Sequence, residues 1–135
     1  MQYDRRSFTR MTTEKLALVA FRVVASTCRR SRATVRISRG GRDHAEAEAE
    51  GDGSMNALFR AANAAIGVRG EVTGLRIYAF DDYDMVGKAR ITVNFEGRKY
   101  AGRGSSPDAV EAAARAYLHA VAAYLSDQIP RTGAE

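Results

Sequence analysis

Residues 45–61, AEAEAEGDGSMNALFRA, decide the fold, because two kinds of periodicity meet there across one glycine turn. The first six residues alternate alanine with glutamate, and a period of two is typical of a strand with one solvated face. Beyond the turn at Gly51 and Gly53, apolar residues recur at helical spacing, as Met55, Leu58, Phe59, Ala62 and Ile66. These residues therefore predict a strand, a glycine turn and a helix in direct succession.

The same order of features returns about fifty residues further along the chain. Residues 97–117 read GRKYAGRGSSPDAVEAAARAY, with a second G-x-G pattern at Gly102 and Gly104. The helix that follows is predicted over residues 107–125, with an apolar face of Val110, Ala114, Tyr117, Val121 and Leu125. An internal repeat of this kind indicates two halves that pack together, since neither half can bury its apolar face alone.

Capping residues are available at the ends of both predicted helices. Ser54 or Asp52 can cap the start of the first, over residues 55–66, and Gly67 can end it. For the second helix, Ser106 is the expected N-cap and Pro107 the first helical residue.

In each half, two further strands are predicted before the strand that leads into the helix. Residues 16–26 are apolar on both sides of a strand and are expected to be buried on both, whereas residues 33–39 alternate, with Val35 and Ile37 inward. In the second half, strands are expected over 75–80, 89–96 and 99–104. Each half therefore reads strand, strand, strand, helix.

The expected fold is α+β, with two pseudo-symmetric βββα units whose sheets are each covered by one helix, and it is expected to be dimeric. A chain of 135 residues with 45% apolar residues forms one such domain. We place it at residues 15–127, with units at about 15–67 and 73–126, a flexible N-terminal arm over 1–14 and a flexible tail over 128–135.

Cysteine usage and hydropathy predict a cytoplasmic protein. Cys28 is the single cysteine, so an internal disulfide is excluded and a reducing compartment is expected. No apolar run approaches the roughly 20 residues of a membrane span, and no apolar signal segment follows the polar first fifteen residues.

A formal net charge of +5 raises the question of nucleic acid, and arginine is concentrated at Arg29, Arg30, Arg32, Arg36, Arg39 and Arg42. However, aromatic residues do not alternate with these arginines, and acidic residues are scattered among the basic ones. A solvated basic face is therefore favoured, and nucleic-acid binding is expected to be absent or weak.

Four stretches together resemble one known family. The run AEAEAEGDGSMNA at 45–57, with LFRA after it, and the run GRGSSPDAVEAAARAY at 102–117 resemble the two glycine motifs in the C-terminal regulatory domain of 2-isopropylmalate synthases and the related citramalate synthases. Residues 75–79 and 84–87 resemble the strand and the D-A-x-G loop between those motifs, so the similarity covers about residues 16–125.

The resemblance implies a sensor rather than a catalyst. In that family the domain consists of two βββα units, dimerises, and binds a branched-chain amino acid or similar small effector near the junction of the units at the dimer interface. The catalytic barrel is a separate part of the enzyme, and it needs roughly 200 residues or more, which this chain does not have. A free-standing module of this type is expected to act on a separate barrel enzyme.

Glycine turns that lead into helix N-termini can hold a carboxylate through close, unpaired N–H groups. With the resemblance, this argument predicts a ligand site at Gly51, Gly53, Ser54, Met55, Ala79, Asp84, Met85, Gly102 and Gly104. The alternative is that the glycines only form tight strand-to-helix turns, and both interpretations stay open at this stage.

The remaining polar residues suggest no metal or cofactor. Glu46, Glu48 and Glu50 form a solvated face by their alternation with alanine, and the aspartates at 81, 82 and 84 lack the glycine and glutamate of an EF-hand loop. His44, His119 and Cys28 have no partners in any catalytic pattern.

One enzymatic alternative is kept beside the sensor. A small cyclase or isomerase of a specialised biosynthetic pathway could use the same pocket, with Asp81, Asp84, Tyr78 or Tyr83 as its acid and base groups.

Overall fold

The computed structural model describes residues 16–25, 27, 29–41, 43–79 and 87–128. In chain order the elements are β1 (Leu16–Val24), β2 (Ser31–Arg39), β3 (Asp43–Gly51), α2 (Ser54–Ile66), β4 (Glu71–Ala79), β5 (Gly87–Phe95), β6 (Arg98–Ser106) and α3 (Ala109–Gln128). The strands form two antiparallel sheets, with the orders β1-β2-β3 and β4-β5-β6. The predicted α+β fold of two βββα units is confirmed.

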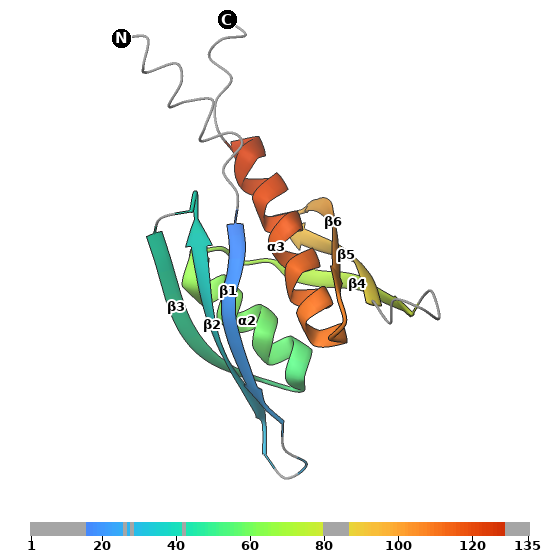
Figure 1. Ribbon diagram of the computed structural model, residues 1–135. Helices are drawn as coiled ribbons and strands as arrows, with labels where there is room; N and C mark the ends of the chain where they lie inside the picture. Colours follow the sequence, from blue (N-terminus) through green and yellow to red (C-terminus); the bar gives the residue numbers. More distant parts are fainter. Residues whose placement is uncertain (1–15, 26, 28, 42, 80–86, 129–135) are drawn as a thin grey trace, which may run out of the picture.

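The two sheets lie on opposite sides of the helices. We call the sheet of β1, β2 and β3 sheet A, and the sheet of β4, β5 and β6 sheet B. Helix α2 packs on β2 and β3 of sheet A, and α3 packs on β5 and β6 of sheet B. In addition, α3 contacts α2 and β1, so it stands between the two sheets (Figure 1). The face of each sheet toward the helices is called its inner face below, and the other its outer face.

The core follows from the alternation of the central strands. Val35 and Ile37 on β2, and Ile91 and Val93 on β5, are at most 1% exposed. They meet the apolar faces of the helices, where the largest fully buried side chain is Tyr117. The two central strands therefore have the inward faces that their period of two predicts.

Strand β1 differs from its prediction, because it is not buried on both sides. A bulge between Leu18 and Ala20 interrupts the alternation, so Leu18 and Phe21 both belong to the inner, half-buried side. The extra residue, Val19, is 46% exposed, and Val24 is 51% exposed. A β-bulge inserts one residue and shifts every later side chain, and a sheet covered by helices on one face leaves the other open.

The helix starts also differ from their predictions. Helix α2 has Gly53 at its N-cap without a side-chain cap, so neither Ser54 nor Asp52 performs that role. Instead, the Asn56 side chain accepts a hydrogen bond from the Asp52 N–H at 3.0 Å. The predicted end is confirmed, because Gly67 adopts the left-handed conformation with φ of 89°.

In the second unit the cap is Asp108 rather than Ser106. The Asp108 Oδ1 accepts hydrogen bonds from the N–H groups of Val110 at 2.8 Å and Glu111 at 3.3 Å. Ser106 Oγ accepts the Asp108 N–H at 3.1 Å, and so it shapes the turn before the helix. Pro107 accordingly precedes α3, which begins at Ala109.

Candidate functional site

The second glycine pattern does not form a turn. Gly102 and Gly104 lie within β6, which continues to Ser106. A Cβ atom on Gly102 would fall on the Ala116 carbonyl oxygen, and one on Gly104 would lie 2.5 Å from the Ala116 backbone nitrogen. These two glycines thus let the α3 backbone approach the sheet closely. Their predicted ligand contact stays a prediction without support from this geometry.

The first glycine pattern does lead into a helix. Gly51 is buried against that helix, since a Cβ on it would lie 2.5 Å from the Ala57 backbone nitrogen. Gly53 has φ of +150°, which favours glycine, and its missing side chain would meet open space. Ser54 and Met55 follow it, both half-buried, so the structure brings these four predicted residues together at the start of α2.

The other predicted site residues lie around the loop between β4 and β5. Ala79 ends β4 and pairs with Gly87, while Tyr78 is half-buried on the outer face of sheet B, opposite Lys88. Asp81, Tyr83, Asp84 and Met85 lie outside the described residues. Their predicted roles, as ligand contacts or as acid and base groups, therefore stay predictions.

A polar contact set, which the sequence reasoning missed, joins the two units. At the end of α2, Asn63 donates to the Gly70 carbonyl at 3.0 Å and accepts the Gly70 N–H at 3.3 Å. Tyr117 of α3 donates its hydroxyl to the same Asn63 Oδ1 and stacks on Phe59 with ring centroids 4.9 Å apart. Burial raises the pKa of the Tyr117 hydroxyl above its usual value, so the group stays protonated, and able to donate, well above neutral pH.

Gly70 is required in this junction. A Cβ at that position would lie 2.7 Å from the Phe95 ring and would also meet the Tyr117 hydroxyl. The sequence offered only a weak signal here, namely a glycine three residues beyond the Gly67 helix end and an asparagine in an alanine-rich turn of α2.

An open groove of about 440 Å³ runs beside this junction. Strand β3 contributes Ala49, helix α2 contributes Arg60, Asn63 and Ala64, and the linker contributes Val68, Arg69 and Gly70. Its volume lies within the roughly 300–1,000 Å³ of small-molecule sites. Small apolar side chains and two guanidinium groups on one groove suit a ligand with a short apolar body and a carboxylate.

The groove and the predicted glycine site are different places. None of Gly51, Gly53, Gly102 or Gly104 lines the groove. Neither Arg60 nor Arg69 makes an ion pair with any other residue that the structure describes. Pattern reading along the chain could not find this groove, because its residues come from three separate elements.

Strand β4 leaves an apolar surface open. Leu75 pairs with Ile91 and Ile77 pairs with Ala89, which places both on the inner face of sheet B. Yet Leu75 is 36% and Ile77 40% exposed. On β1 the matching residues, Phe21 and Val23, are half-buried and pack against the core. The cause is α3, which contacts β1 but only marginally reaches β4.

The predicted solvated glutamate face is an array of cross-strand ion pairs. Arg32 contacts Glu48 at 3.3 Å and Glu50 at 3.0 Å, and Arg36 contacts Glu46 at 3.5 Å. Two arginines of the predicted basic patch are therefore compensated by carboxylates on β3.

In the described residues no group of three or more His, Cys, Asp or Glu side chains could hold a metal ion. His119 Nδ1 accepts a hydrogen bond from the Arg103 N–H at 3.0 Å. None of the described helices is long and apolar enough to cross a membrane.

A comparison with known protein families shows to which family this two-unit fold belongs. The model of the LeuA allosteric (dimerisation) domain matches residues 4–125, which span the first βββα unit and the second up to the last turn of α3. The chain belongs to this family. This match confirms the family resemblance that the two glycine motifs indicated.

The chain is also similar to three 2-isopropylmalate synthases. The chain is 37% identical over 92 residues to 2-isopropylmalate synthase of Pyrococcus furiosus, covering 67% of this chain and 18% of that protein. It is 36% identical over 109 residues to the synthase of Acidimicrobium ferrooxidans, covering 80% and 21%. With the synthase of Afipia carboxidovorans the identity is 30% over 118 residues, covering 87% and 22%. The chain thus spans about a fifth of the length of these relatives.

Proposed function

We propose that this LeuA allosteric domain senses a small carboxylate, a branched-chain amino acid or a related 2-keto or 2-hydroxy acid, and regulates a barrel-type synthase. The observation that carries the proposal is the groove at the junction of the two units, where Arg60 and Arg69 line the same cavity as Ala49, Ala64 and Val68. Ligand binding there would act directly on the segment that joins the units.

The chemistry of the groove matches this ligand class. A guanidinium group can bind a carboxylate through two parallel hydrogen bonds, and two such groups provide a strong preference for an anion. The alanine and valine side chains can cover a short branched chain, but they offer no hydrogen bonds to a sugar or a nucleobase.

Dimerisation would place a second copy beside the groove. The proposed interface is the inner face of β4, with the exposed Leu75 and Ile77. Gly70, which lines the groove, is followed directly by Glu71, the first residue of β4. A partner on β4 would therefore border the groove, so that ligand binding and association become linked.

The barrel partner is inferred from the relatives. They are named as synthases, and this chain matches about a fifth of each. A (β/α)₈ barrel occupies roughly 200 residues or more, and the two units leave no room for one here.

A thermal-shift experiment with leucine, isoleucine, valine and their 2-keto and 2-hydroxy analogues tests ligand binding. A binding acid should stabilise the chain by about 2.7 kcal/mol at a hundredfold excess over its Kd. Arg60→Gln and Arg69→Gln should remove most of that shift. Arg22→Gln, on the exposed outer face of sheet A, is the matched control and should keep it.

The sensor proposal fails if no acid stabilises the wild type, or if the two groove variants respond as strongly as Arg22→Gln. The interface is tested separately by sedimentation. The wild type should sediment at twice the 14.7 kDa of the chain, and Leu75→Gln with Ile77→Gln should sediment as a monomer. Val24→Gln, at a more exposed apolar position on β1, should remain dimeric.

A further inference from the structure

The outer faces of the two sheets have equivalent strand pairing but differ in charge, since sheet A is balanced and sheet B is positive. Strand pairing aligns Arg22, Thr34 and Glu48 in one row across sheet A. The corresponding row across sheet B is Arg76, Arg90 and Arg103. The same position in the two sheets therefore carries balanced charge in one and three positive charges in the other.

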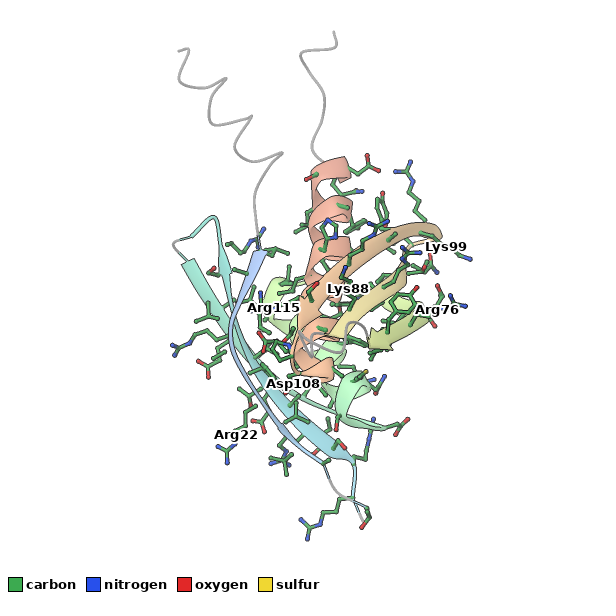
Figure 2. The ribbon with its side chains drawn as sticks, turned by 45° about the vertical axis from the view of Figure 1, so that its right-hand side comes forward. Arg22, Arg76, Lys88, Lys99, Asp108 and Arg115 are labelled. Atoms are coloured by element: carbon green, nitrogen blue, oxygen red, sulfur yellow. The ribbon has the colours of Figure 1, made fainter. Side chains whose placement is uncertain are left out.

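The neighbouring rows continue the contrast. On sheet A the row of Val24, Arg32 and Glu50 and the row of Ala20, Arg36 and Glu46 each join one arginine to one glutamate. On sheet B the equivalent rows are Tyr78, Lys88, Ser105 and Gly74, Thr92, Ala101, without any acidic residue. Figure 2 shows Arg76, Lys88 and Lys99 on sheet B, with Arg22 at the opposite side of the view.

The arginine row is not compensated inside the described part of the chain. Arg76, Arg90 and Arg103 are exposed, and their guanidinium groups make no ion pair or hydrogen bond with another described residue. Side chains directly opposite each other on neighbouring strands have Cβ atoms only about 4.5–5.5 Å apart, and like charges there destabilise the sheet. Sheet A shows that this fold can accommodate a glutamate at the equivalent position.

We propose that the outer face of sheet B, defined by Arg76, Arg90 and Arg103, is a docking surface for an acidic surface of another protein. The charge complement that sheet A carries on its own strand β3 would here be supplied by the partner. The surface lies on the opposite side of sheet B from α3, and it is independent of carboxylate binding in the groove.

The shape of the face favours a protein partner. Gly74, Thr92 and Ala101 form a row of small residues beside the arginines, so a partner's strand or loop can lie flat against the sheet. On β3 of this chain, alternate glutamates meet arginines across strands at 3.0–3.5 Å, which shows the kind of acidic pattern that fits such a sheet. Single-stranded nucleic acid instead calls for several aromatic stacking platforms, and the described outer face offers only the half-buried Tyr78.

Fluorescence anisotropy of the full chain with a labelled ten-residue polyglutamate peptide tests the proposal, at about 0.15 M salt so that long-range charge effects are screened. The variant Arg76→Gln, Arg90→Gln, Arg103→Gln should bind the peptide at least tenfold more weakly than the wild type. The control variant Arg22→Gln, Arg32→Gln, Arg36→Gln removes the same charge from sheet A and should change the affinity by less than about twofold. Circular dichroism confirms that both variants are folded.

Equal weakening of the two variants would overturn the proposal, because net charge alone would then explain the binding. It would also be overturned if ten-residue oligothymidylate bound more tightly than polyglutamate and depended on the same three arginines, since the partner would then be a nucleic acid. Absence of any binding to the peptide by the wild type would equally reject it. None of these outcomes affects the thermal-shift test of the groove.

Discussion

Strands β1 and β4 hold the same position in their units but have different surroundings. Each is the first strand of its sheet, and each has a bulge close to its start, between Leu18 and Ala20 in one and between Val72 and Gly74 in the other. Helix α3 covers the inner face of β1 in addition to its own sheet, whereas α2 does not approach β4. The repeat in sequence is thus not a repeat in packing, and the second unit leaves Leu75 and Ile77 exposed on the inner face of β4.

The two helices also approach their sheets differently. On β3 the inner residues Ala47 and Ala49 face α2, while the equivalent positions on β6 are Gly102 and Gly104. The missing methyl groups allow the backbone of α3 to lie directly on the strand. The helix that covers both sheets is therefore the one with the closest packing.

The largest effect is expected when that close packing is broken. Gly102→Ala should lower the free energy of unfolding by about 3 kcal/mol, because the new methyl group would overlap the Ala116 carbonyl and force α3 away from β6. Ala47→Gly at the equivalent position of β3 should cost only about 1 kcal/mol, from lost burial and added chain freedom. Urea unfolding at a fixed protein concentration measures both, and similar costs would show that the helices pack alike.

A smaller difference should separate the two first strands. Phe21→Ala should cost about 2 kcal/mol at any protein concentration, because Phe21 is half-buried under α3. Leu75→Ala should cost less than about 1 kcal/mol in dilute solution and more as the concentration rises, since the proposed partner of this side chain is a second copy. Thermal unfolding over a hundredfold range of concentration distinguishes the two, and a constant cost for Leu75→Ala would speak against the β4 interface.

The hydrogen bond at the junction between the units should contribute less to the free energy of unfolding than the packing of Phe21. Tyr117→Phe removes a buried hydrogen bond but leaves Asn63 bonded to Gly70, so a cost of about 1 kcal/mol is expected. Tyr124→Phe, which keeps the ring stack on Phe95 at 4.2 Å, is the matched control and should be nearly neutral.

The same variant has a pH signature. Burial raises the pKa of Tyr117 in the folded chain, so above pH of about 10 the unfolded chain releases this proton first and stability falls. The difference in stability between wild type and Tyr117→Phe should therefore be constant through neutral pH and shrink above about pH 10. A difference that grows there would contradict the buried position of the hydroxyl.

The smallest change in stability is expected from charge substitutions in the residue rows on the outer faces of the two sheets. Arg90→Glu places a carboxylate between Arg76 and Arg103 and should raise stability by about 0.5 kcal/mol. Glu48→Arg on sheet A should lower it, since it removes the contact with Arg32. Both effects should disappear in about 1 M salt. If Arg90→Glu destabilises the chain even at low salt, the arginine row is not repulsive.

Sequence patterns predicted what depends on local periodicity. The alternation on β2 and β5, the apolar faces of both helices and the glycine end of α2 at Gly67 are all confirmed, because each rests on neighbouring residues within one element. The bulge at Val19 was missed, since a run that is apolar on both sides gives no sign of a shifted register.

The site was harder to predict than the fold. Gly102 and Gly104 in β6 were predicted to form a turn. The feature that requires glycine there, the closely packed backbone of α3, lies in another element. The groove was not predicted for the same reason. The hydrogen-bond partners of the Asn63 side chain, Gly70 and Tyr117, likewise lie in separate parts of the chain. Asp81, Tyr83, Asp84 and Met85, between β4 and β5, lie outside the described residues, so the part of the site predicted there stays a prediction.

The cover that α3 provides for β1 has a consequence for how the chain is made. A ribosome adds about 5–20 residues each second from the N-terminal side, so β1 emerges before its covering helix, Ala109–Gln128. During the intervening seconds Phe21 and Val23 are not covered by α3, and the nascent first unit exposes apolar side chains on the inner face of its sheet. Chaperones that bind exposed apolar strands would therefore be needed most between synthesis of the two halves, and a stop codon anywhere before α3 would release a fragment prone to aggregation.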